Sequence, residues 1–278
     1  MGTDQVDATL LNIGAEDVAV SPPAEGADVF PEHKASREPV AQRIVVTLEA
    51  CASRQGAMTI VELVEATGLA KTTVHRMCWK LVELGLLEHS SRGFCVGSKV
   101  FALAATNPRI SQLRVAAIPH LVELQRRTGA MVNLATLSGG RALIIDALFT
   151  ERSSRLPKLV GHALPLHCTG AGKAIAAALD LEERERLLFG GGPLPSVAKS
   201  TIVQPGLLRR HLQRVAETGI AVADGEFLPG VKALAAGFRL RDGGAVAIGV
   251  VEAWNSQTLR AAPAAVADAA AALRRVLN

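Results

Sequence analysis

The chain has 278 residues, enough for two domains that each bury a core of their own. It contains no apolar run of transmembrane length, and its N-terminus lacks the basic-then-apolar order of a secretory signal, so we expect a cytoplasmic protein with no membrane partner. Residues 1–36 carry seven acidic side chains and one lysine, whereas the remainder carries 29 basic and 19 acidic ones, a balance compatible with nucleic-acid binding.

The acidic start of the chain shows no lasting hydrophobic period, so residues 1–36 are predicted to form a mobile acidic tail. The four cysteines are far apart and include no C-x-x-C pair, which argues for a reducing compartment and against a disulfide framework or a zinc site. His162 and His167 also lack metal-binding spacing, so we expect no metal.

The first predicted helix covers Pro39 to Ser53, where apolar residues recur at helical spacing. The stretch from Met58 to Leu84 then predicts two short helices joined by a tight turn. Thr59 and Glu62 have the spacing of a capping box, and Gly68 stands where a left-handed residue ends a helix at little cost.

The second of these helices begins near Ala70 and has two different faces. Its buried side consists of Val74, Met77, Cys78 and Leu81. Its outer side offers hydrogen-bond donors and positive charge from Lys71, Thr72, Thr73, His75, Arg76 and Lys80. A DNA-reading helix needs this distribution, because it packs on one side and lies between two phosphate backbones on the other. The alternative is an ordinary amphipathic hairpin with a solvated basic face.

A predicted β-hairpin after this helix favours DNA binding. Gly85 ends the helix, Leu86–Glu88 and Phe94–Val96 form the strands, and Ser90–Gly93 forms the turn. Residues 37–97 are therefore predicted to be a winged helix-turn-helix domain, with Arg92 at the wing tip. The predicted DNA-contacting residues are Thr59, Lys71, Thr72, Thr73, His75, Arg76, Lys80 and Arg92.

The second half of the chain mixes helices and strands. Helices are predicted at Ser98–Thr106, Ile110–Thr128, Gly170–Leu179, from Asp180, at Leu207–Glu217 and from about Thr258. Strands are predicted at Met131–Leu137, Arg141–Phe149, Ile220–Ala223, Val231–Leu240 and Ala245–Val251, and Thr150–Val160 is predicted to be a polar loop. This pattern, in which Ser138-Gly139-Gly140 marks a hairpin, predicts an α+β domain.

Two short motifs in this half invite a chemical interpretation. The segment from Gly170 to Lys173 fails the spacing of a phosphate-binding loop, because Ala174 replaces the required Ser or Thr. The free amides of Gly170 and Ala171 can instead attract a carboxylate at the helix start, although the glycines can also serve the turn alone. Cys168 beside His167 could be a thiol and base, but adjacent side chains on an extended segment point apart.

Three stretches carry a resemblance to a known family. The segment GLAKTTVHRMCWKLVELGLLE followed by GFCVG resembles the DNA-binding domain of isocitrate-lyase-regulator-type (IclR) transcriptional regulators. LPLHCTGAGKAIAAAL and GIAVADGEFLPGVKALAA resemble two stretches of that family's effector-binding domain. The three matches occur in the family's order, over residues from about 40 to the end. Departures occur at Phe94, where tyrosine is usual, and at Gly237, where proline often follows the last motif.

The resemblance implies a linker helix within residues 98–110 that helps to pair subunits, and a GAF-like effector-binding domain of about six strands over 111–278. It implies that the α-helix amides at Gly170 and Ala171 bind the effector. It also implies that Glu226, which matches the family's usual glutamate, borders the effector cavity.

In members of the family that sense small oxo-acids, an aspartate, a cysteine or serine and two hydroxyls assist these amides. The matching positions here are Ala223 beside Asp224, Ala233, and Val250 with Glu252, so the polar ring is thinned. A shift of one residue in strand register would turn the neighbouring side chains inward instead. The predicted effector-binding residues are Met131, Leu143, Gly170, Ala171, Asp224, Ala233, Val250 and Glu252, with Ile145 as a further candidate for the wall. We predict an aromatic or alicyclic effector with at most one polar group near the Gly170 amides.

Together these features predict a sequence-specific DNA-binding transcriptional regulator controlled by a small organic metabolite, without a cofactor. Its expected partner is double-stranded operator DNA, bound as a homodimer or as a tetramer built from dimers. The competing hypothesis is a metabolic enzyme with an N-terminal helical interaction module, which would need a triad, metal cluster or cofactor motif in residues 110–278. We find none there. A purely structural DNA-binding protein would leave the second domain without a purpose.

Overall fold

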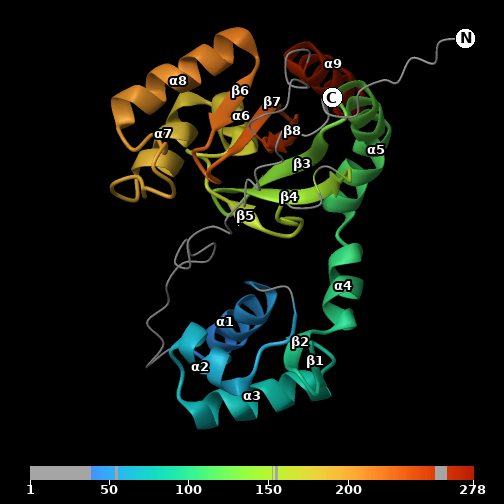
Figure 1. Ribbon diagram of the computed structural model, residues 1–278, viewed down its shortest axis with the longest axis vertical. Helices are drawn as coiled ribbons and strands as arrows, with labels where there is room; N and C mark the ends of the chain where they lie inside the picture. Colours follow the sequence, from blue (N-terminus) through green and yellow to red (C-terminus); the bar gives the residue numbers. More distant parts are fainter. Residues whose placement is uncertain (1–38, 54–55, 152, 154–155, 254–261) are drawn as a thin grey trace, which may run out of the picture.

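The computed structural model describes residues 39–53, 56–151, 153, 156–253 and 262–278. The predicted acidic tail and the expected start of the last helix near Thr258 lie outside this part. The described chain forms a small N-terminal domain and a larger C-terminal domain, with helix α4 (Ser98–Ala105) between them (Figure 1). Within these residues no helix is both long and apolar enough to cross a bilayer.

The N-terminal domain is a winged helix-turn-helix. Three helices, α1 (Val40–Ser53), α2 (Ile60–Thr67) and α3 (Lys71–Glu83), precede the antiparallel strands β1 (Leu87–Ser90) and β2 (Gly93–Val96). Their shared core contains Leu63, Val74, Cys78, Leu81 and Phe94. The predicted buried stripe of α3 is confirmed except that Met77 is only half-buried.

The predicted capping box of α2 is confirmed. The Thr59 hydroxyl accepts from the Glu62 amide at 3.3 Å, and the Glu62 carboxylate accepts from the Thr59 amide at 2.8 Å. Gly68 ends the helix with φ of 66°, in the left-handed region that glycine adopts without steric cost. Residues next to each end of α2 therefore satisfy its terminal backbone groups, and the helix stops directly before the turn to α3.

The C-terminal domain contains one antiparallel six-stranded sheet in the order β5-β4-β3-β8-β7-β6. Its strands are β3 (Met131–Ser138), β4 (Arg141–Leu148), β5 (Ala163–Leu164), β6 (Ala221–Asp224), β7 (Val231–Arg239) and β8 (Ala245–Ala253). The sheet confirms the predicted α+β class. Sequence reasoning missed β5, because two residues are too short to show a period.

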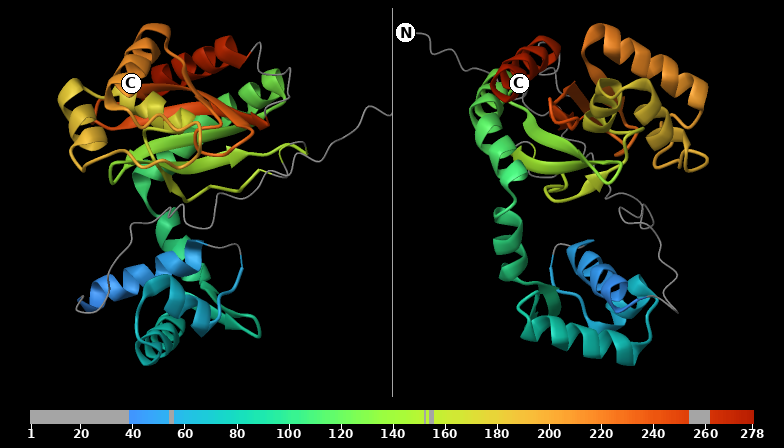
Figure 2. Two further views of the ribbon diagram at one scale, coloured as in Figure 1. Left: turned by 60° about the vertical axis from the view of Figure 1, so that its left-hand side comes forward. Right: turned by 180° about the vertical axis from the view of Figure 1, so that it is seen from behind.

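Helices cover both faces of the sheet (Figure 2). One face packs on α5 (Pro108–Thr128) and α9 (Ala262–Leu277), with Leu121, Val250 and Leu273 in that core. The other packs on α6 (Gly170–Ala178) and α8 (Pro205–Thr218), while α7 (Leu181–Phe189) lies beside them. Since both faces are buried, the central strands are apolar at almost every position.

Helix α4 and the start of α5 occupy the predicted linker at 98–110. Asn107 caps α5 by accepting from the Ile110 amide at 3.1 Å, and Pro108 occupies its first turn. The predicted interruption at Asn107 and Pro108 is therefore a helix start, for which proline is well suited. The predicted boundary between the winged domain (37–97) and the linker (98–110) coincides with the start of α4 at Ser98.

Candidate DNA-binding surface and effector cavity

Helix α3 lies at the end of the molecule remote from the C-terminal domain (Figure 1). Five of its six predicted DNA-contacting residues are exposed, and Thr73 is half-buried. Lys71 and Arg76 on this helix, and Arg92 in the turn of the wing, have no ion pair within the described residues. Their charges are therefore available to a phosphate or a base edge.

The other predicted DNA contacts are partly engaged within the protein. Lys80 forms an ion pair with Glu83 at 2.7 Å, and the Thr59 hydroxyl donates to the Glu62 carboxylate at 2.9 Å. The His75 Nε2 atom accepts from the indole N–H of Trp79 at 3.2 Å, which favours the tautomer with its proton on Nδ1. His75 can then offer a donor to DNA, although the assignment of all eight residues stays a prediction.

Helix α4 is hydrogen-bonded to the wing and to the end of α3, the two elements that are predicted to contact DNA. The Glu88 carboxylate of β1 accepts from the Ser98 amide at 2.9 Å, which lowers the pKa of Glu88. The Lys99 ammonium donates to the Leu84 carbonyl, directly after α3, at 3.0 Å. Movement of α4 would therefore act on the wing and on the end of α3 together.

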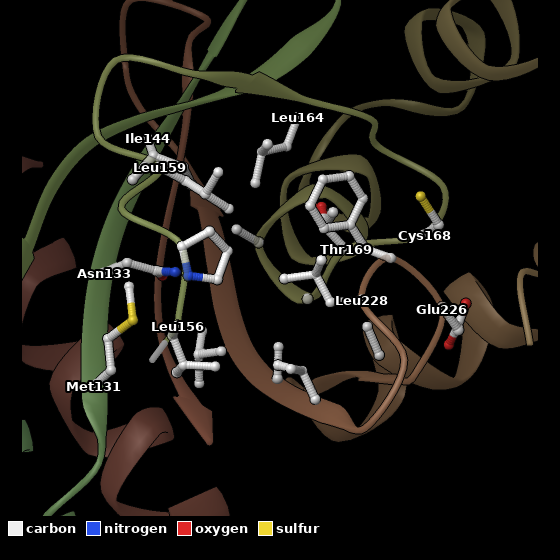
Figure 3. A pocket seen from close by; sticks show the side chains of 18 residues that line it. Met131, Asn133, Ile144, Leu156, Leu159, Leu164, Cys168, Thr169, Glu226 and Leu228 are labelled. Atoms are coloured by element: carbon white, nitrogen blue, oxygen red, sulfur yellow. The ribbon is translucent and has the colours of Figure 1, made fainter. Parts of the chain in front are cut away.

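A cavity lies in the C-terminal domain between the sheet, the start of α6 and the loop after β6 (Figure 3). The centre of a water molecule can occupy about 70 Å³ of it, which is room for several waters or a small organic ligand. Its lining is mostly apolar and includes Met131, Ile144, Leu156, Phe227, Leu228 and Val251. Such a site favours ligands that lose little hydration on entry.

The start of α6 points its free amides at this cavity. Thr169 caps the helix by accepting from the Gly172 amide at 3.0 Å, while the amides of Gly170 and Ala171 have no acceptor among the described residues. A Cβ at Gly170 would approach the Cβ of Ala233 to 3.0 Å, so glycine allows α6 to pack closely on β7. The helix dipole and the two amides together favour a negative group here.

A buried ion pair closes one side of the cavity. The Lys173 ammonium, which is fully buried, lies 2.5 Å and 2.6 Å from the two Glu226 oxygens and 3.1 Å from the Val222 carbonyl. Burial lowers the pKa of Lys173 and raises the pKa of Glu226, while their mutual hydrogen bonds oppose both changes. Burial and the Lys173 charge also lower the pKa of His211, 3.5 Å away, to about 4.

The structure places half of the predicted effector-binding residues at the cavity. Met131, Gly170, Ala171 and Ala233 line it, and so does Glu226. The position of Ala223, where small-acid sensors carry an aspartate, also lies at the cavity. The cavity therefore has a methyl group, and no carboxylate, at residue 223.

Four of the predicted effector-binding residues lie elsewhere. Leu143 and Val250, together with Ile145, face α5 and α9 on the opposite side of the sheet. Glu252 shares the Val250 side of β8, because strand residues two apart face the same way. Asp224 forms an ion pair with Lys232 at 3.0 Å instead of facing the cavity. The prediction that Leu143, Asp224, Val250 and Glu252 line the effector cavity is therefore wrong.

Neighbouring residues that sequence reasoning did not select take their places. Ile144 lines the cavity where Leu143 was expected, and Ala223 lines it where Asp224 was expected. Val251 lines it where Val250 and Glu252 were expected. Val251 is one residue away from both Val250 and Glu252, so an error of one residue in the predicted facing of β8 explains this difference. Asn133 was also missed, because a single polar residue in an apolar strand gives no periodic signal.

Cys168 and His167, the candidate thiol and base, are both buried. Burial raises the pKa of the Cys168 thiol to about 12, which removes the thiolate that a nucleophile needs. The His167 Nε2 atom lies 2.9 Å from the Pro195 carbonyl, and burial lowers its pKa. Within the described residues, no group of three or more His, Cys, Asp or Glu could hold a metal ion.

Both domains of the chain match known protein families. Residues 40–91 match the IclR helix-turn-helix domain, and residues 109–275 match the bacterial transcriptional regulator IclR C-terminal domain. The chain belongs to the IclR family of transcriptional regulators. Its helix-turn-helix domain binds DNA, and its C-terminal domain binds a small-molecule effector.

Individual IclR relatives match over most of their length. The transcriptional repressor IclR of Escherichia coli (strain K12) is 30% identical over 68% of this chain and 70% of its own. The acetate operon repressor of Salmonella typhimurium is 29% identical over the same shares. The crystal structure of an IclR homolog from Microbacterium hydrocarbonoxydans, complexed with 4-hydroxybenzoate, superposes with a TM-score of 0.73 at 26% identity, covering 85% of this chain and 98% of that one.

Proposed function

We propose that this IclR-family regulator responds to an aromatic or alicyclic acid bound in the cavity beside α6. The observation that carries the proposal is a mostly apolar lining combined with the unpaired amides of Gly170 and Ala171. The cysteine and aspartate positions of small-acid sensors hold Ala233 and Ala223, so a small, strongly hydrated acid would regain only part of the hydrogen bonds that it loses on leaving water. A ring compound would contact the apolar lining and place its carboxylate at the amides.

A relative supports this ligand class. The IclR homolog from Microbacterium hydrocarbonoxydans was crystallised with 4-hydroxybenzoate, an aromatic acid. That protein shares the architecture of 85% of this chain.

Titration calorimetry with benzoate, cyclohexanecarboxylate, pyruvate and glyoxylate tests the ligand class. We expect the ring acids to bind at least about tenfold more tightly than the small oxo-acids, because only they bury apolar surface in the cavity. Substituting Gly170 with alanine, which crowds Ala233, should weaken the ring acids, whereas Gly191→Ala in an open loop serves as the matched control. Tight binding of pyruvate or glyoxylate alone would exclude the proposed class.

We further propose that two copies pair through α4. Phe101 and Leu103 are 74% and 58% exposed, and no residue of α4 is buried against the chain's own winged domain. Large apolar side chains that are exposed so close together on one helix indicate a surface that another protein chain covers. Pairing would also bring two α3 helices to successive major-groove faces, with operator half-sites about 10 bp apart or a multiple of that distance.

Replacing Phe101 and Leu103 together with glutamate should convert the protein to monomers at micromolar concentration. Two buried charges from each subunit would cost far more at the interface than surface glutamates do, whereas the fold should persist because both positions are exposed. Sedimentation velocity measures the change, and Val203→Glu, at an exposed apolar position outside α4, is the control. A wild-type chain that sediments as a monomer would contradict the pairing.

The protein would act in the cytoplasm on operator DNA and would catalyse no reaction, since the named relatives are transcriptional regulators. An effector that binds one arrangement of the two domains more tightly would change the population of DNA-competent dimers through α4.

A further inference from the structure

Asn133 is a polar residue at the centre of the sheet whose side chain faces the apolar cavity (Figure 3). It is only 9% exposed. Its carboxamide makes no hydrogen bond among the described residues, and its oxygen and nitrogen are not fully enclosed, so they are open to the cavity. A carboxamide offers two donors and two acceptor sites, and no group of the described fold uses those of Asn133. The side chain is therefore poised to bind a group that is not part of the fold.

The other polar side chains at the cavity are already engaged. The Thr169 hydroxyl donates to the Pro165 carbonyl at 2.8 Å while it accepts from the Gly172 amide. Both Glu226 oxygens accept from Lys173. Two sets of groups thus remain for a ligand: the Asn133 carboxamide, and the amides of Gly170 and Ala171.

These two sets lie on opposite sides of the cavity. Helix α6 begins against β7, where Gly170 meets Ala233. Asn133 lies on β3 and pairs with Gly249 of β8, which in turn pairs with Ala235 of β7. Two inter-strand spacings, about 10 Å, therefore separate the strand that carries Asn133 from the one that supports α6. One small polar group cannot reach both sides, whereas a ring substituted at opposite ends can.

We propose that Asn133 determines effector specificity by hydrogen-bonding a second polar group at the end of the ring opposite the carboxylate. The effector is then a ring acid with a hydroxyl or oxo group opposite its carboxylate, held at the helix amides by one end and at Asn133 by the other. This inference rests on the proposed ring-acid effector and adds a requirement to it, because the sequence alone predicted a polar group only near the amides.

The test compares benzoate with 4-hydroxybenzoate by titration calorimetry on the wild-type protein and on Asn133→Leu. In the wild type the added hydroxyl should tighten binding on the order of tenfold, the effect of one hydrogen bond formed in a buried site. In Asn133→Leu this preference should disappear while benzoate binds at least as tightly as before. Gln213→Leu, which removes an exposed carboxamide from α8 outside the cavity, should leave the preference intact.

A measurement without ligand checks the premise. Asn133→Leu should leave the Tm of the ligand-free protein unchanged or raise it, because the carboxamide makes no hydrogen bond among the described residues and opens on the cavity. A lower Tm would show that the fold satisfies the carboxamide and would overturn the inference.

The outcomes separate this inference from the proposal beneath it. If benzoate binds more tightly than pyruvate but the wild type shows no preference for the hydroxyl, or Asn133→Leu keeps that preference, Asn133 is not the determinant and the ring-acid class stands. If neither ring acid binds, the ring-acid proposal fails and the role of Asn133 fails with it.

Discussion

Replacing Lys173 with methionine should lower the free energy of unfolding by about 3–5 kcal/mol near neutral pH, the cost of removing one partner of a buried ion pair. Glu226 would keep its burial but lose the ammonium that lies 2.5 Å and 2.6 Å from its oxygens. Methionine fills the volume of the lysine stem, so packing changes little. Chemical denaturation followed by circular dichroism measures the loss.

The loss should shrink as the pH falls toward about 5. Burial already raises the pKa of Glu226, and Lys173 opposes that rise, so the variant's pKa should be higher still. The folded variant then binds a proton in a range where the unfolded chain does not, and its stability increases as the pH falls. Denaturation curves at two pH values reveal the slope.

Lys232→Met provides the matched control for Lys173→Met. Lys232 forms an ion pair with Asp224 at 3.0 Å, but both side chains are partly exposed, so the expected loss is below about 1 kcal/mol. A double variant, Lys173→Met with Glu226→Leu, should recover much of the stability because no charge stays buried. Equal losses for the two lysine variants, or a loss at Lys173 that grows on acidification, would contradict this account.

Replacing Lys71, Arg76 and Arg92 together with alanine should reduce operator affinity by at least about a hundredfold. Arg76, on the outer face of α3, should alone contribute about 1–3 kcal/mol if it contacts a base edge. Lys71 and Arg92 are placed to contact phosphates, so their loss should weaken all sequences alike and lower the slope of log affinity against log salt by about one each.

Gel-shift titrations at several salt concentrations measure both effects, on a duplex that the wild-type protein selects from a random library. The triple variant Arg186, Arg210 and Arg274 to alanine removes the same charge from exposed positions of the C-terminal domain and should retain operator affinity. Wild-type affinity in the Lys71, Arg76 and Arg92 variant would refute the assignment of this surface. Equal losses in both variants would show that affinity depends on the net charge of the protein and not on these three positions.

The sequence predicted the winged domain closely because its signals are local. Thr59 with Glu62, and Gly68 after them, act within a few residues of the helix ends they define, and the structure confirms each one. Likewise Gly129 and the pair Gly139 and Gly140 adopt positive φ, where the sequence predicted a helix end and a hairpin.

The cavity could be predicted only in part, and β8 shows why. Its sequence, AVAIGVVEA, is apolar on both sides because helices cover both faces of the sheet. The alternation that distinguishes inward from outward residues is absent from such a strand. Val250 was therefore chosen where Val251 faces the cavity, and Leu143 was chosen where Ile144 does.

By itself, the sequence determined the order of the elements, the helix ends, the charged face of α3 and the free amides at the start of α6, because these depend on spacing along the chain. The tertiary structure decided which face of each strand meets the cavity, that Lys173 is buried against Glu226, and that Asn133 lacks a partner. These features join residues far apart in sequence, such as Lys173 and Glu226. They depend on strand pairing and on helix packing, which no local pattern encodes.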